Sequence, residues 1–133
     1  MKNLVCRAVI LADAVLDSRD DAKGATLMGV RSRFAATQDG VSFAVYMVLA
    51  GTGEQRFWGS VVSHGAPQPA TADPLFEISH DFGERSQAYF IGEVVNMKIP
   101  PGDYDFVVVN ETDGSQLGAI AFITESDDVN DHP

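Results

Sequence analysis

The side chains in this sequence that could do chemistry are few, and none has the spacing of a known catalytic motif. The histidines are His64, His80 and His132. His64 and His80 flank a proline-containing segment, so a closed loop would bring them together, and imidazole with nearby carboxylates is a donor set that zinc or iron accepts. No His-x-His or His-Glu-x-x-His spacing supports such a site. We expect ordinary surface histidines, with a metal-dependent or ligand-binding enzyme at the His64/His80 loop as an alternative.

An acidic stretch between Asp13 and Asp21 is the second candidate site. It contains Asp13, Asp17, Asp20 and Asp21, and calcium is bound by several carboxylate oxygens gathered in one bend. The stretch lacks the alternating acids and the central glycine of an EF-hand loop. It is therefore predicted to be a solvated loop, and a metal bound there belongs to the same enzyme alternative.

The nucleophilic side chains indicate no site either. The sequence has no Gly-x-Ser-x-Gly motif. Cys6 lies in an apolar run beside Arg7, which a strand would direct to its opposite face, so a packed thiol is expected. Asp103 and Asp105 would share one side of a strand around Tyr104, which favours a solvated edge. We predict no catalytic, cofactor-binding or metal-binding residue and no cofactor, hence a protein that is not an enzyme.

The length and the net charge of the chain limit the kinds of protein it can be. A chain of 133 residues is long enough for one domain with its own core. It has 19 acidic and 9 basic residues, a net charge of -10, which argues against nucleic acid and anionic membranes as partners. The single cysteine excludes an internal disulfide, and no apolar run reaches the length of a membrane-spanning helix. A cytoplasmic location is expected.

Alternating apolar and polar residues predict strands throughout the chain. The clearest run is 41–49, where every odd position is apolar and large. Turn signals separate the runs, and no segment has convincing helical periodicity. These features predict an all-β fold, a single antiparallel β-sandwich of about eight strands. The predicted strands are 4–12, 26–34, 41–49, 56–64, 75–79, 87–99, the end of 100–110, and 116–124.

The segment from Pro100 to Asn110 indicates a subclass of this fold. Pro100-Pro101-Gly102 is a tight turn, and Tyr104 follows it at the start of the next-to-last strand. In immunoglobulin-like sandwiches a tyrosine at this place hydrogen-bonds back to the preceding corner. We expect an immunoglobulin-like domain over residues 1–124. Residues 125–133 form an acidic tail with few apolar residues, which predicts disorder.

Short motifs resemble a group of small uncharacterised bacterial proteins. That group has an apolar first strand ending in Asp, like residues 10–13 here, then a Gly-Lys-Leu-x-Leu-x-Gly-Val strand, like residues 23–30. It closes with a Pro-Gly-x-Tyr-x-Phe hairpin, like residues 101–106. The similarity covers residues 4–124, although Lys23-Gly24 inverts the usual order. The resemblance implies a β-sandwich domain of unknown function.

Apolar side chains on the predicted outer faces, Val48, Trp58 and Val62, favour a binding role. We expect a non-enzymatic binding or assembly module that associates with itself, as a homo-oligomer, or with a protein partner. Its interface would use the sheet that carries Arg56, Trp58 and His64. A carbohydrate-binding sandwich, in which exposed aromatic rings stack on sugars, is a further alternative.

Overall fold

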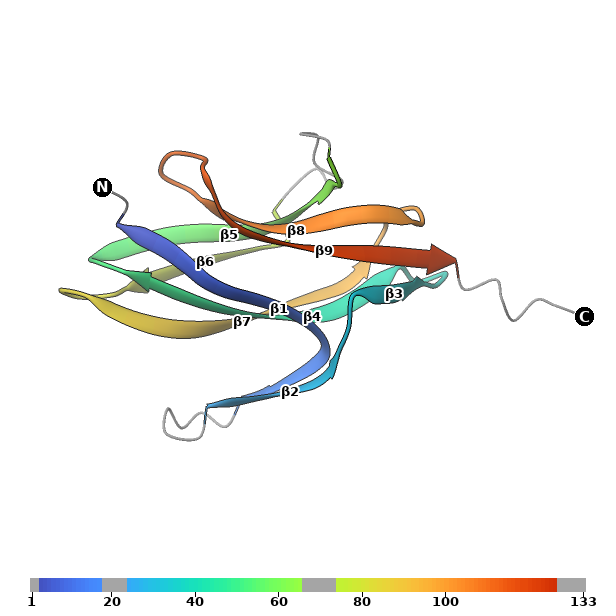
Figure 1. Ribbon diagram of the computed structural model, residues 1–133, viewed down its shortest axis with the longest axis horizontal. Helices are drawn as coiled ribbons and strands as arrows, with labels where there is room; N and C mark the ends of the chain where they lie inside the picture. The colour runs from blue at the N-terminus through green and yellow to red at the C-terminus, as the bar shows by residue number, and fades with distance from the viewer. Residues whose placement is uncertain (1–2, 18–23, 66–73, 127–133) are drawn as a thin grey trace, which may run out of the picture.

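The structure is a computed structural model of the chain, and it describes residues 3–17, 24–65 and 74–126. In these ranges the chain forms nine strands and no helix, so none that could cross a membrane (Figure 1). The strands are β1 (Leu4–Asp17), β2 (Ala25–Val30), β3 (Arg33–Ala36), β4 (Val41–Gly51), β5 (Glu54–Ser63), β6 (Phe76–Asp81), β7 (Ser86–Met97), β8 (Gly102–Asn110) and β9 (Gln116–Ser126).

The strands form two layers. Sheet A has the order β2-β1-β4-β7, and sheet B has the order β3-β9-β8-β5-β6. All neighbours are antiparallel except β3 and β9, which run parallel with Arg33 opposite Ile123. The predicted all-β class is confirmed. The described residues form nine strands where about eight were predicted. The expectation of wholly antiparallel pairing was wrong, because β3 and β9 are parallel.

The extra strand arises because the predicted strand 26–34 belongs to both layers. Gly29 takes a left-handed φ of 69°, a conformation that interrupts a regular strand and that glycine adopts without strain. After β2 ends in sheet A, Arg31 and Ser32 carry the chain across to sheet B. The Ser32 carbonyl accepts a hydrogen bond from the Ile123 amide, which sets the start of β3 beside β9.

The core between the sheets is rich in phenylalanine. The odd positions of β4 from Val41 to Leu49 are all buried, as the alternation predicted. Phe43 in sheet A lies 5.0 Å from Phe34 and 5.3 Å from Phe122 between ring centroids, and both partners belong to sheet B. Tilted and edge-to-face pairs of this kind hold two sheets together beyond simple area burial. The core therefore uses one face of β4 completely.

Phe76 packs between the sheets where β6 approaches β7. Its ring stacks on Phe106 at 5.8 Å and passes directly over two glycines, Gly59 of β5 and Gly92 of β7. A Cβ atom added at either glycine would lie 2.5 Å from the Phe76 ring. The missing side chains thus make the space that this aromatic ring occupies.

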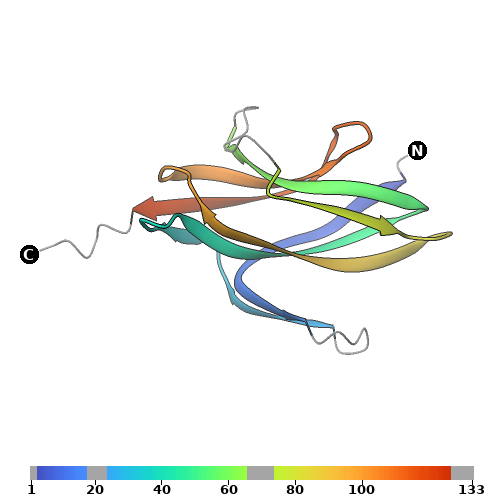
Figure 2. The ribbon, with the colours of Figure 1, turned by 180° about the vertical axis from the view of Figure 1, so that it is seen from behind.

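The hairpin of β1 and β2 lies outside the sandwich. β1 pairs with β4 as far as Ala12, where the same residue also pairs with Val30 of β2. Beyond Ala12, β1 turns back over the outer face of sheet A, on the side away from sheet B (Figures 1 and 2). The hairpin is held by one face only, because Leu16, Met28 and Val30 on its other face are exposed.

This hairpin corrects the expectation of a solvated loop from Asp13 to Asp21. Residues 13–17 continue strand β1, and residues 18–23 lie outside the described ranges. Pairing with β2 supplies backbone hydrogen bonds to this acidic segment, and an ion pair joins Asp13 to Arg31. At the other end of the chain, β9 runs to Ser126, past the predicted boundary at 124, and the rest of the predicted tail lies outside the described residues.

Tyr104 makes the hydrogen bond that the sequence predicted. Its hydroxyl donates to the carbonyl oxygen of Pro100 at 2.6 Å. Burial raises the pKa of this hydroxyl, which keeps it protonated as a donor. The Thr124 hydroxyl donates to the same carbonyl at 3.1 Å and accepts from the Gly102 amide. The turn before β8 is therefore fixed from two sides.

Replacement of Gly92 by alanine tests the packing of Phe76. We expect Gly92→Ala to lower the free energy of unfolding by about 1–3 kcal/mol, since the methyl group would overlap the ring. In a Phe76→Leu background the same change should cost much less, because the overlapping ring atoms are gone. Urea unfolding of the four proteins gives the coupling energy. An equal cost in both backgrounds would show that the ring does not limit the size of residue 92.

Removal of the Tyr104 hydroxyl tests the turn. Tyr104→Phe should lower the free energy of unfolding by about 1 kcal/mol, because Thr124 still donates to the Pro100 carbonyl. Thr124→Val in the same chain leaves that carbonyl without either donor, so the double variant should lose more than the sum of the single variants. Strict additivity in urea unfolding would argue against a shared acceptor.

Candidate ligand-binding cleft

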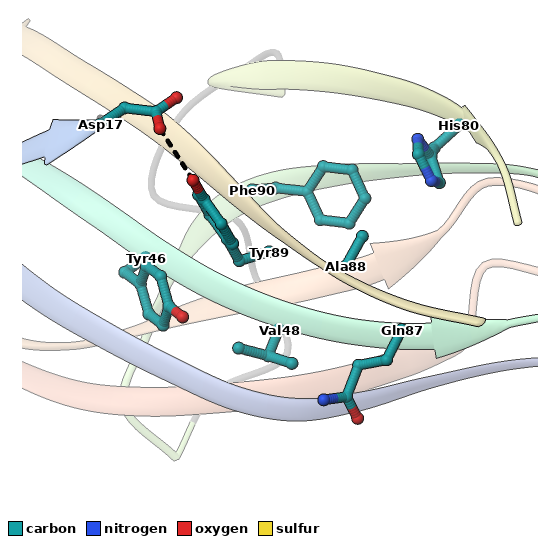
Figure 3. A pocket seen from close by; sticks show the side chains of 8 residues that line it. All are labelled: Asp17, Tyr46, Val48, His80, Gln87, Ala88, Tyr89 and Phe90. Carbon is teal, nitrogen blue, oxygen red and sulfur yellow. Dashed lines mark hydrogen bonds between the residues drawn. The ribbon is translucent and has the colours of Figure 1, made fainter. Parts of the chain in front are cut away.

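A hollow lies on the outer face of sheet A, next to the end of the β1–β2 hairpin. Its volume is about 650 Å³, within the range of small-molecule and cofactor sites. It also extends around the free edge of β7, so residues from both faces of that strand line it (Figure 3). The lining residues are Asp17, Tyr46, Val48, His80, Gln87, Ala88, Tyr89 and Phe90.

Two stacked tyrosines form the centre of the cleft. The odd residues of β4 fill the core, so Tyr46 at an even position points outward. The register sets Ile91 opposite Tyr46 and Tyr89 opposite Val48, which makes the tyrosines diagonal neighbours on one face. Their ring centroids are 5.7 Å apart and their planes differ by 27°. Both side chains are half-buried, so each keeps part of its surface accessible.

Asp17 connects the hairpin to this aromatic surface. The Tyr89 hydroxyl donates a hydrogen bond to Asp17 Oδ1 at 2.8 Å, the dashed line in Figure 3. Asp17 is the last residue of β1, and Tyr89 lies near the start of β7. A hydrogen bond to a carboxylate is stronger than one between neutral groups. It fixes both the Tyr89 ring and the end of the hairpin.

The other wall of the cleft lies where the edges of the two sheets meet. β7 is the last strand of sheet A and β6 the last strand of sheet B. The His80 ring packs edge-on against Phe90 at 5.1 Å and against Phe82 at 4.6 Å. His80 thus contributes a mostly aromatic contact to this wall.

A second, smaller hollow of about 220 Å³ continues the same face toward the start of β1. Ala50 lines this hollow and is the register partner of Gln87, which lines the large cleft. Arg7 and Arg85 both line the small hollow and are exposed. Among the described residues, neither forms an ion pair. The residues around it are Asn3, Val5, Arg7, Ala50, Gly51, Thr52 and Arg85.

The chemistry available on this face is recognition of a flat, anionic ligand. The tyrosine rings can stack on a planar group, and the Gln87 amide can both donate to and accept from its edge. Arg7 and Arg85 carry planar guanidinium groups that suit phosphate or carboxylate oxygens. The tyrosine pair and the two arginines line neighbouring hollows on this face.

The residues predicted to bind a partner lie elsewhere. Phe57 is buried, so Arg56 and Trp58 point outward from β5 on sheet B. His64 follows β5, and its Nδ1 lies 2.9 Å from Asp105 Oδ1. That hydrogen bond and the charge of Asp105 raise the pKa of His64. The structure therefore keeps Arg56, Trp58 and His64 apart from the cleft on sheet A.

The two metal sites considered as alternatives to the main prediction are not assembled in the described residues. His80 pairs with Gln55 at the opposite end of β5 from His64, a separation of about 30 Å along the strand at ~3.3 Å per residue. Asp13 is paired with Arg31, and residues 18–21 of the acidic stretch lie outside the described ranges. No group of three or more His, Cys, Asp or Glu side chains is close enough there to hold a metal ion.

Cys6 is half-buried, and burial raises the pKa of its thiol. A raised pKa keeps the sulfur as the less reactive thiol at neutral pH. This agrees with the packing role expected from the sequence.

Sequence reasoning missed the residues that form the cleft. Tyr46 had the right signal, because it alternates with core residues and must face outward. Its neighbour Tyr89 could not be found, since their contact depends on the register of β4 with β7. Arg7 and Arg85 are 78 positions apart in the sequence, so nothing local indicated that they share a hollow.

The chain matches no protein-family profile and no curated protein. Among solved structures, it is similar to the Pseudomonas fluorescens alkylpurine DNA glycosylase AlkC bound to DNA containing an abasic site analog. The sequence identity is 12% and the TM-score is 0.51. The match covers 94% of this chain and 31% of that protein, so this chain spans about a third of its length. A likeness at this identity shows a shared fold.

This comparison contradicts the functional expectations drawn from the sequence. We expected a non-enzymatic binding or assembly module that associates with itself or with another protein and does not contact nucleic acid. The protein that shares the fold is an enzyme and is bound to DNA. The argument from charge used a net charge of -10, which is a sum over the whole chain. It does not reveal that Arg7 and Arg85 lie together beside an aromatic cleft.

Proposed function

We propose that the chain binds single-stranded nucleic acid through the cleft on sheet A, with unpaired bases stacked on Tyr46 and Tyr89. The observation that carries this proposal is the stacked tyrosine pair, 5.7 Å between ring centroids, within a hollow of about 650 Å³. Base stacking on aromatic side chains contributes roughly 1–3 kcal/mol per base and tolerates any sequence, because every base has a π face.

The rigidity of the two rings supports this role. Both side chains are half-buried, and Asp17 holds the Tyr89 hydroxyl at 2.8 Å. Rings that are already fixed lose little conformational freedom when a base stacks on them, so more of the stacking energy remains as affinity.

The shape of the site favours an unpaired strand over a duplex. Inside a duplex the faces of a base are covered by its neighbours, and only its edges are accessible. The hairpin beside the tyrosines leaves a depression of a size that suits a base. The likeness to a DNA-bound glycosylase supports nucleic acid as the ligand class.

The acidic composition limits the expected affinity. Phosphates are attracted by the few arginines near the cleft and repelled by the surplus of 10 negative charges on the chain. Sequence-independent binding typically has a Kd of about 1–100 μM at physiological salt. We expect this chain to lie in that range, with stacking as the main contribution.

We also propose that the fold is an immunoglobulin-like sandwich. The two facing sheets and the hydrogen bond from Tyr104 to Pro100 support this assignment. A reducing compartment such as the cytoplasm is supported by the single cysteine of the chain.

Fluorescence anisotropy with labelled eight-nucleotide dT and rU strands tests the proposal. Wild-type protein should bind the single strands and should bind a duplex of the same length more weakly. Tyr46→Ala and Tyr89→Ala should each weaken binding about 5- to 100-fold, since each removes one stacking surface. Tyr89→Phe keeps the ring and loses the bond to Asp17, so its effect should be smaller.

The matched control is Trp58→Ala, which removes an outward aromatic residue from sheet B. It should leave binding unchanged. The proposal is wrong if the wild-type protein does not bind single strands at low salt, or if Trp58→Ala weakens binding as much as the tyrosine substitutions do.

A further inference from the structure

We infer that Arg7 and Arg85 form a phosphate subsite at one end of the cleft, so that a bound strand runs along β7 from these arginines to the tyrosines. This inference rests on the proposed function. It adds a contact to the sugar-phosphate backbone, a direction for the strand and a length for the ligand.

The local composition of the small hollow suits an anion. Its two charged lining residues are both arginines, and no carboxylate is among its described lining residues. Two arginines elsewhere are neutralised, since Arg31 pairs with Asp13 and Arg33 with Glu125. A guanidinium group presents parallel N–H donors that match two phosphate oxygens. Two such groups lining one hollow make it a candidate anion site.

The arginines converge from separate parts of the chain. Arg7 belongs to β1, and Arg85 lies in the turn just before β7. The strand between them is β4, whose end supplies Ala50 and Gly51 to the floor of the hollow. These small residues leave room above the floor for a tetrahedral group.

The hollow and the cleft are neighbours on this face, since Ala50 of the hollow and Gln87 of the cleft are register partners. Arg85 lies in the bend that leads into β7, and Gln87 and Tyr89 of β7 both line the cleft. Tyr89 is four positions beyond Arg85, a span of at most about 13 Å at ~3.3 Å per residue. A stacked strand advances ~3.4 Å per nucleotide. A ligand that reaches both ends therefore contains roughly four nucleotides.

The salt dependence of binding measures this subsite. For single strands, the logarithm of the association constant falls with the logarithm of the salt concentration by about 0.7 for each phosphate neutralised. Arg7→Gln and Arg85→Gln should each reduce this slope by about 0.7 and weaken binding of labelled dT8 roughly 3- to 10-fold at 50 mM salt. Arg56→Gln is the matched control, because Arg56 is an exposed arginine on sheet B.

The outcomes separate the subsite from the proposed function. The subsite is supported if Arg7→Gln and Arg85→Gln bind more weakly and with a smaller salt slope, while Arg56→Gln binds like wild type. Equal losses for all three variants indicate diffuse attraction and overturn it. If Tyr46→Ala weakens binding while both cleft arginine variants bind like wild type, the subsite fails and the function stands. If wild type binds no strand, both fail.

A length series tests the path itself. Affinity for labelled dT2, dT4 and dT8 should rise strongly up to dT4 and little beyond it, because four nucleotides span both ends. The expected gain from dT2 to dT4 should disappear in Arg85→Gln. Equal affinity for dT2 and dT4 would show that the arginines and the tyrosines do not hold one strand.

Discussion

The geometry of the cleft depends on one backbone constraint, the double pairing of Ala12. This residue pairs with Ala44 of β4 and with Val30 of β2, and it is completely buried. One strand thereby belongs to the sheet and to the hairpin beside it. Because backbone ladders are much stiffer than loops, the hairpin keeps a fixed height above sheet A, and the Asp17 carboxylate reaches the Tyr89 hydroxyl.

The interior packing explains why an aromatic surface is available outside. Phenylalanines from both sheets fill the space behind β4, and Phe76 fills the edge over Gly59 and Gly92. The core therefore needs only alternate residues of β4 and β7. Since side chains alternate along a strand, the positions between them face outward. Tyr46 and Tyr89 occupy two of these positions without disturbing the packing on which stability depends.

The sequence predicts the strands well and their partners poorly. The run 41–49 carries its own signal, because its buried and outward residues alternate over a full strand. The acidic residues after Ala12 indicated a loop, but pairing with β2 outweighed their low strand propensity. The crossing at Arg31 and Ser32 has no composition signal of its own. The cleft could not be predicted for the same reason, since Tyr46 and Tyr89 are 43 positions apart and meet only in one register of β4 with β7.

The parallel pairing of β3 with β9 has a consequence for how the chain reaches its fold. Arg33 meets Ile123, 90 positions later in the chain. At a synthesis rate of about 5–20 residues per second, β9 is made on the order of 5–20 s after β3. Closure of so long a loop also slows folding into the millisecond-to-second range of β proteins. An unpaired strand edge can pair with strands of other protein chains. β3 lowers this risk because it has only four residues and carries the exposed Arg33.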